Sequence, residues 1–171
     1  MKMSKTRRMS PTVKQLAALA LFRSCTPNEL ARIDNLKTAV HVGTGTVICA
    51  EHQPGREFFV VANGRVCVTA GSQCIGHLAS GDAFGEVALM DFGSRIATVT
   101  AVQPTELLVF NRAEFTAMLH RAPSVGRELL RIAAHRLRDA HRMPDQPNAT
   151  HSSLPDEVLT AGASNREYDH V

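Results

Sequence analysis

The amino-acid sequence predicts a mainly β protein, a β-roll of about eight short strands with two helices before it and two after it. Short runs rich in β-branched residues alternate with turn signals between residues 38 and 110. Helical spacing of apolar residues is confined to the regions on either side of these runs. A chain of 171 residues, of which 44% are hydrophobic and 20% charged, suits one globular domain with a substantial core.

Two short helices are predicted ahead of the strands. Residues 13–24 form the first helix, and residues 26–36 form the second. Thr26 is suited to the N-cap of the second helix, Pro27 stands at its first helical position, and Glu29 lies three residues after the cap. Together they make the capping box that is typical of a helix start.

The strand region is divided by turns of glycine, proline and asparagine, and this spacing predicts a sandwich, a jelly roll or a barrel. The pair Asn63-Gly64 separates two valine-rich runs and is the strongest hairpin signal in the chain. The turn signals in chain order are Gly43-Thr44-Gly45, Pro54-Gly55, Asn63-Gly64, Gly71-Ser72, Gly81-Asp82 and Gln103-Pro104.

Two more helices are predicted after the strands. Asn111 is expected to cap a short helix that runs through Leu119. Pro123-Ser124 opens a longer helix, which ends before Pro144 because a proline is common just past a helix end. The apolar stripe of this helix can pack on the roll or on a second copy, and we expect a homodimer through the helix. The stripe consists of Leu130, Ala133, Ala134 and Leu137.

The charge is distributed unevenly along the chain. Residues 1–14 carry a charge of +5 and residues 143–171 a charge of −4, within a net charge of +3. The tail is rich in proline and serine and has no apolar period, so neither end is expected to fold. We therefore expect a basic disordered arm at 1–14, a folded domain at 15–142 and an acidic disordered tail at 143–171.

The sequence predicts a cytoplasmic protein without membrane contact, because it contains neither a run of about 18 apolar residues nor a signal-peptide pattern. Cys25, Cys49, Cys67 and Cys74 show no CxxC spacing and no paired histidine motif. In a reducing compartment such cysteines are expected to be small buried hydrophobes rather than disulfides or zinc ligands. No metal is expected.

Residues 81–101 interrupt the strand pattern and carry the chemistry. Glu86 begins a single helical turn after Gly85, and Arg95 returns the chain to a strand. Backbone N–H groups at a helix start and a planar guanidinium both suit a phosphate. A carboxylate would repel that phosphate, so its natural role is to accept a hydrogen bond from a ribose hydroxyl. The residues therefore indicate a sugar-phosphate pocket, and the alternative is a plain ion pair between Glu86 and Arg95.

The segment Phe84-Gly85-Glu86-Val87-Ala88-Leu89, followed after five residues by Arg95-Ile96-Ala97-Thr98-Val99, resembles the phosphate-binding cassette of cyclic nucleotide-binding domains. Such domains occur in protein kinase A regulatory subunits, catabolite-activator-type regulators and cyclic nucleotide-gated channels. The resemblance extends over residues 18–142. It implies an eight-stranded β-roll, a jelly-roll-like double-stranded β-helix, with N-terminal helices and a C-terminal lid helix.

The resemblance also implies a role for each residue of the cassette. Arg95 binds the exocyclic phosphate oxygens, and Glu86 accepts the ribose 2′-hydroxyl. The final helix usually closes over the base, and Arg131 is the candidate contact, with His135 as a second one. Ile96 departs from the family, because this position is usually small or hydroxylated. The implied ligand-binding residues are Gly85, Glu86, Val87, Ala88, Arg95, Ile96 and Arg131.

The predicted function is a non-catalytic sensor or regulatory subunit that binds cyclic AMP. A hydroxyl after the arginine favours guanine in the family, so Ile96 favours cyclic AMP over cyclic GMP. Ligand binding is expected to draw the helix at 123–142 over the base and so to signal to an effector protein that the sequence does not identify. The bulk of Ile96 supports an alternative, a degenerate domain that acts as a protein-interaction module.

The sequence does not favour two further function classes, a transcription regulator and an enzyme. A catabolite-activator-like transcription regulator carries a helix-turn-helix after the long helix, whereas residues 143–171 hold three prolines and no helical period. Direct DNA binding is therefore not expected, and it would depend on the basic arm alone. Catalysis is not expected either, because the eight histidines form no HExxH motif and no serine lies in a GxSxG context.

Overall fold

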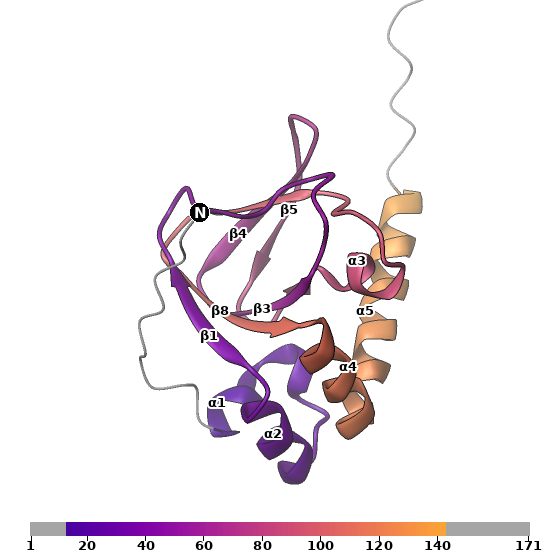
Figure 1. Ribbon diagram of the computed structural model, residues 1–171. Coiled ribbons are helices and arrows are strands. Elements are labelled where there is room, and N and C mark those ends of the chain that lie inside the picture. The colour runs from indigo at the N-terminus through magenta and orange to yellow at the C-terminus, as the bar shows by residue number, and fades with distance from the viewer. Residues whose placement is uncertain (1–12, 143–171) are drawn as a thin grey trace, which may run out of the picture.

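The computed structural model describes residues 13–142 of the chain, so most of the basic arm and all of the acidic tail lie outside the described residues. Two helices and a short 3₁₀ turn precede the strands, one short helix interrupts them, and two helices follow (Figure 1). These elements are α1 (Val13–Ala18), the 3₁₀ turn (Ala20–Phe22), α2 (Pro27–Asp34), α3 (Glu86–Met90), α4 (Arg112–Arg121) and α5 (Pro123–Arg142).

Eight strands in the described part of the chain form two antiparallel four-stranded sheets. The first sheet has the order β1-β8-β3-β6, and the second has the order β2-β7-β4-β5. The predicted fold class, a mainly β roll with flanking helices, is therefore confirmed. The strands are β1 (Thr38–Val42), β2 (Val47–Cys49), β3 (Glu57–Asn63), β4 (Arg65–Ala70), β5 (Gln73–Ala79), β6 (Ala83–Phe84), β7 (Thr98–Ala101) and β8 (Thr105–Asn111).

The core has two parts, and strand β3 contributes to both. Successive side chains of a strand point to opposite faces of its sheet. Phe58 and Val60 of β3 belong to the cluster that includes the helices, whereas Phe59 and Val61 belong to the cluster inside the roll. All four side chains are at most 2% exposed. The alternation places the ring of Phe59 inside the roll, where it lies beside the guanidinium of Arg95.

The helix starts follow the predicted local signals. Thr26 Oγ1 accepts from the N–H of Glu29, whose carboxylate accepts from the N–H of Thr26. Asn111 and Glu114 form the same reciprocal pair at the start of α4. The prediction of one helix over residues 13–24 was wrong, because the chain is extended at Leu19. This break allows the adjacent side chains of Leu21 and Phe22 to be buried together. In a continuous helix, adjacent side chains point in different directions and do not share one face.

The turn at Asn63-Gly64 is not a hairpin, which corrects the sequence interpretation. Strand β3 pairs with β6 and β8, whereas β4 pairs with β5 and β7, so the turn carries the chain from one sheet to the other. Gly64 has a φ of 103°, and a Cβ there would lie 2.5 Å from Thr105 Oγ1. The hairpin is formed instead at Gly71-Ser72, between β4 and β5.

The buried side of α5 differs from the predicted stripe. Val125 and Leu129 are 0% and 5% exposed and pack in the core, with Ile132 packed against it. Leu130, by contrast, is 72% exposed, and the rest of the predicted stripe is exposed as well. The stripe therefore does not pack on the roll. No helix of the described residues combines the length and the hydropathy needed to span a bilayer.

The expectation of four buried cysteines was also wrong. Cys25, Cys49 and Cys67 are only partly buried, and Cys74 is exposed. Burial raises the pKa of the Cys25 thiol to about 11. Two of the four cysteines lie on neighbouring strands, β4 and β5, in a position that the sequence pattern did not reveal.

Candidate functional site

The candidate site is built around Gly85, which follows β6 and is the N-cap of α3. Its φ of 89° lies in the left-handed region, where a side chain is strained. A Cβ at this position would lie 2.5 Å from Arg95 Nη1 and 3.0 Å from the carbonyl oxygen of Glu57. Glycine is therefore required here for two reasons, the backbone conformation and the close approach of the guanidinium.

The side chain of Arg95 points into the protein and is held on several sides. The residue is 5% exposed. Its Nη1 donates to the carbonyl oxygen of Gly85 at 3.1 Å, and its Nη2 donates to the carbonyl oxygen of Glu57 at 2.7 Å. The Glu57 carboxylate lies 3.6 Å from Nη2, and the guanidinium carbon lies 5.5 Å from the centre of the Phe59 ring. These contacts fix the orientation of the guanidinium before any ligand binds.

Gly55 is a second glycine that makes room for this arrangement. A Cβ at Gly55 would lie 2.3 Å from the Cβ of Ala88 and 3.3 Å from the guanidinium carbon of Arg95. Ala88 is one of the predicted cassette residues and is 2% exposed. The close contact between Gly55 and Ala88 therefore packs the first turn of α3 against the loop before β3.

Glu86 is the first residue of α3, and it joins the cassette to the last helix. Its Oε1 accepts a hydrogen bond from Arg136 Nη1 at 2.8 Å, and Arg136 Nη2 donates to the carbonyl oxygen of Ala83. Helix α5 passes beside α3 at this point (Figure 1). Glu86 and Arg95 do not form the ion pair that was the alternative interpretation, since each has a different partner of opposite charge.

Two buried side-chain polar atoms in residues 13–142 have no hydrogen-bond partner, and they belong to these two residues. They are Arg95 Nε, a donor, and Glu86 Oε2, an acceptor. A buried polar atom left without a partner costs about 1–3 kcal/mol, so each such atom in a folded protein needs a reason. The donor on the cation can bind an oxygen of an anionic phosphate, and the acceptor on the carboxylate can bind a hydroxyl group.

The remaining predicted residues lie as follows. Val87 is 38% exposed, and Ile96 is 67% exposed, so the isoleucine side chain does not fill the interior of the roll. Arg131 is held by Glu128 on its own helix, with Nη2 and Oε1 2.6 Å apart, and His135 is exposed. The pairing with Arg131 lowers the pKa of the Glu128 carboxyl.

The expected contact of Arg131 with the base stays a prediction, and the structure adds a contact between the last helix and the cassette that the sequence did not predict. Arg136 makes that contact, and Arg131 does not take part in it. Five helical positions rotate a side chain by about 140° around the helix axis, so the two arginines leave α5 in different directions. The predicted apolar stripe is not the buried side of α5, so the sequence did not predict how this helix is rotated on the roll.

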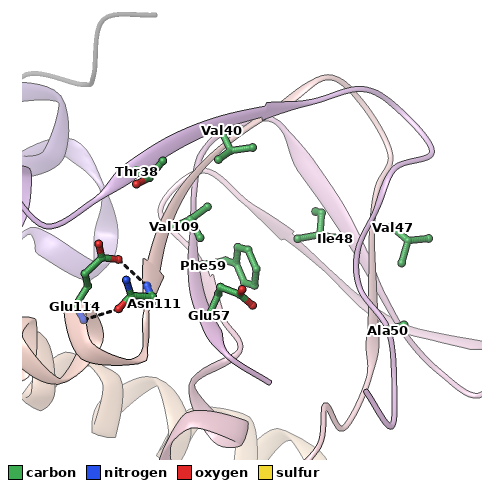
Figure 2. Close-up of a pocket in the computed structure, with 10 residues that line it drawn as sticks. All are labelled: Thr38, Val40, Val47, Ile48, Ala50, Glu57, Phe59, Val109, Asn111 and Glu114. Atoms are coloured by element: carbon green, nitrogen blue, oxygen red, sulfur yellow. Dashed lines mark hydrogen bonds between the residues drawn. The ribbon is translucent and has the colours of Figure 1, made fainter. Parts of the chain in front are cut away.

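A cavity of about 680 Å³ lies inside the roll next to this site (Figure 2). It shares two residues, Glu57 and Phe59, with the surroundings of Arg95. Glu86 and Arg95 do not line it, so the atoms without partners define the candidate site and the cavity adjoins it. The residues that line the cavity are Thr38, Val40, Val47, Ile48, Ala50, Glu57, Phe59, Val109, Asn111 and Glu114.

Sequence reasoning missed four residues that shape the site. Gly55 was predicted only as a turn residue. Glu57 acts largely through its backbone carbonyl, which no side-chain pattern reveals. Phe59 belongs to a run of apolar residues in which the sequence does not single it out. Arg136 is one of several basic residues on α5, and only the rotation of that helix distinguishes it.

Comparisons with known proteins agree with this geometry. The family model described as the cyclic nucleotide-binding domain matches residues 39–122. A putative potassium channel protein of Rhodopseudomonas palustris is 32% identical over 71% of this chain and 30% of its own length. The cyclic AMP receptor protein of Thermus thermophilus is 37% identical over 50% of this chain and 42% of its own length.

A solved structure supports the same relationship. The crystal structure of the Thermus thermophilus catabolite activator protein superposes with a TM-score of 0.66 and 31% identity, over 71% of this chain and 60% of that one. The chain spans less than half of the length of the two curated relatives above. The shared region includes the cassette, with Gly85, Glu86 and Arg95 all inside the matched residues. Residues 39–122 of this chain belong to the cyclic nucleotide-binding domain family.

Proposed function

We propose that this chain binds cyclic AMP between Arg95 and Glu86 and acts as a non-catalytic sensor. The observation that supports this most directly is the pair of buried atoms without partners, Arg95 Nε and Glu86 Oε2. A cyclic nucleotide offers a partner to both, a phosphate oxygen for the donor and a ribose hydroxyl for the acceptor. Its binding would therefore remove two unfavourable contributions that the protein alone leaves in place.

The electrostatics of the site suit a singly charged phosphate. The guanidinium of Arg95 is permanently charged and sits where water is largely excluded, so its attraction to an anion is weakly screened. Glu57 lies 3.6 Å away and is half exposed, so it offsets only part of that charge. The backbone around Gly85, Val87, Ala88 and Ile96 would complete the phosphate site.

We propose that Arg136 couples ligand binding to the position of helix α5. This residue holds one oxygen of Glu86 while the other oxygen has no partner. A ribose hydroxyl that binds Oε2 therefore acts on the same carboxylate that connects α3 to α5. Ligand binding would then bias the position of α5 through this carboxylate, and no contact from Arg131 is needed.

The choice of cyclic AMP over cyclic GMP depends on Ile96. No hydroxyl is present at this position to favour guanine, and the relative from Thermus thermophilus is named a cyclic AMP receptor protein. The exposure of Ile96 also weakens the alternative of a degenerate domain, which assumed that the isoleucine obstructs the phosphate.

Isothermal titration calorimetry with cyclic AMP, cyclic GMP and 5′-AMP tests the proposal. We expect saturable heat with cyclic AMP and weaker binding of the other two. Arg95→Ala removes a charged, largely buried partner of the phosphate, so affinity should fall by about 30–150-fold, equivalent to about 2–3 kcal/mol. Arg95→Lys should recover part of this loss, because it restores the charge without the planar fork.

The matched control is Arg65→Ala, which removes an exposed arginine from β4 and should leave the binding heat unchanged. Circular dichroism and thermal unfolding of each variant verify that it is folded. Equal heats from the wild type and Arg95→Ala would refute the site. A folded wild type that gives no heat with any of the nucleotides would favour the protein-interaction module instead.

A further inference from the structure

A cluster of sulfur and nitrogen ligands lies on the hairpin of β4 and β5, away from the cassette. It consists of Cys67 on β4 and Cys74 and His77 on β5. The two Sγ atoms are 2.7 Å apart, and one ligand atom from each residue lies within 4.8 Å of the other two. It is the one group of three or more such residues within the described part of the chain.

A β-bulge is what brings the three side chains together. Cys67 pairs with His77 and Val68 with Gly76, but Thr69 then pairs with Cys74, so that Ile75 is left over. In a regular ladder Thr69 would pair with Ile75, and Cys74 would lie on the opposite face from Cys67. The extra residue shifts the register by one and turns Cys74 onto the face of Cys67 and His77.

This face of the hairpin is the outer one. Val66 is buried in the cluster inside the roll, and Val68 and Leu78 pack against that cluster. Side chains alternate along a strand, so the three ligand residues point away from the interior. Cys74 and His77 are exposed, which gives an ion access from solvent.

We propose that Cys67, Cys74 and His77 form a binding site for Zn²⁺ or a similar thiophilic divalent cation. Thiolate and imidazole are the ligands that Zn²⁺ prefers. Each thiol releases its proton to solvent on binding, and the two thiolates then balance the charge of the ion. With bonds of about 2.3 Å to sulfur and about 2.0–2.1 Å to nitrogen, tetrahedral ligand atoms are separated by roughly 3.5–3.8 Å. No separation among the three ligand atoms exceeds 4.8 Å, and the two Sγ atoms, now 2.7 Å apart, would move apart by about 1 Å to take up this geometry. The fourth position is left for water.

His77 is the residue that distinguishes this site from a simple thiol pair. A disulfide between Cys67 and Cys74 would use both sulfurs and would give the imidazole no role. Coordination uses all three groups, which the bulge places on one face by turning Cys74 toward Cys67 and His77. Sequence spacing did not reveal the site because the ligands come from two strands and the register changes between them.

The test uses the full-length chain, reduced, stripped of metal and kept without oxygen, and titrated with Co²⁺ as a spectroscopic probe. We expect one equivalent to give a sulfur-to-cobalt charge-transfer band and intense tetrahedral d–d bands, both removed by Zn²⁺. Loss of an outer-shell partner alone costs about 10–100-fold in metal affinity. Loss of a ligand in Cys67→Ser, Cys74→Ser or His77→Ala should therefore cost more than about 100-fold in affinity.

Matched controls come from cysteine and histidine residues elsewhere in the chain. Cys49→Ser and His120→Ala should leave the cobalt spectrum and the Zn²⁺ affinity unchanged, because neither residue belongs to the cluster. Oxidation of the wild type to a Cys67–Cys74 disulfide should abolish metal uptake. The proposal is overturned if the reduced wild type shows no sulfur-to-metal band, or if Cys67→Ser and His77→Ala bind as tightly as the controls. Neither result depends on cyclic nucleotide binding.

Discussion

Replacing Arg136 by alanine tests whether helix α5 supports the ligand through Glu86. The guanidinium of Arg136 contacts one oxygen of Glu86 and leaves the other without a partner. If Arg136 orients the carboxylate, its removal means that the ligand must order Glu86 by itself. We therefore expect Arg136→Ala to weaken the binding of cyclic AMP rather than to strengthen it.

The size of the effect follows from the exposure of the pair. The Arg136 side chain is 41% exposed and that of Glu86 is 12% exposed. A charge-assisted hydrogen bond contributes about 1.5–3 kcal/mol when buried, whereas an exposed ion pair contributes about 0.2–1 kcal/mol. Because solvent screens the arginine, we expect the pair to contribute about 1 kcal/mol to binding, which corresponds to about fivefold in affinity.

Calorimetry with cyclic AMP on Arg136→Ala, Arg136→Lys and Arg138→Ala measures this difference. Arg138 is an exposed arginine on the same helix, so its replacement controls for the loss of a positive charge. The difference between wild type and Arg136→Ala should shrink as salt is raised, because a half-exposed pair is screened. Tighter binding by Arg136→Ala would show that Arg136 competes with the sugar and would refute this reasoning.

Three further changes have expected outcomes. Gly85→Ala places a Cβ 2.5 Å from the Arg95 guanidinium and should weaken cyclic AMP binding in calorimetry, whereas Gly71→Ala, with nothing within 4 Å, should not. Hydrogen bonds hold the pKa of buried Glu29 below its ordinary value of 4.5, so its stabilising effect is fully present above that pH and is lost as the pH falls through the lower pKa of the folded protein. Glu29→Gln should therefore lower the free energy of unfolding by about 1–3 kcal/mol at pH 7, with the difference closing in acid, as urea titrations would show. Leu130→Glu should convert a homodimer to a monomer in light scattering, and a wild-type monomer would contradict the proposed dimer.

The helix starts at Thr26 and Asn111 were predictable because the residues that form each capping box are close in sequence. The capping boxes of α2 and α4 each join residues three positions apart. The order of helices and strands follows from periodicity within short windows. The pair Asn63-Gly64 shows that strand pairing does not follow from local patterns. A turn between two strand patterns does not state which strands pair, and here β3 and β4 belong to different sheets.

The candidate site was predictable in part for the same reason. Gly85, Glu86 and Arg95 lie within one short segment, and the structure brings them together around the start of α3. Their partners are distant in sequence, since Arg95 contacts the backbone of a residue 38 positions away and Glu86 contacts one 50 positions away. No local pattern identifies the carbonyl group of Glu57 as a partner of Arg95. Nor does a local pattern select Arg136 among the arginines of α5 as the partner of Glu86.

The sequence by itself determined the capping boxes and the strand pattern, because each depends on residues only a few positions apart, and it placed Gly85, Glu86 and Arg95 in one short segment. Tertiary structure alone decided that Arg136 rather than Arg131 reaches Glu86, because a helix turns its side chains by about 100° per residue and packing sets its rotation. It also decided that Cys74 joins Cys67 and His77. A shift of one residue in strand register moves a side chain to the opposite face, and the pairing of two strands sets that register.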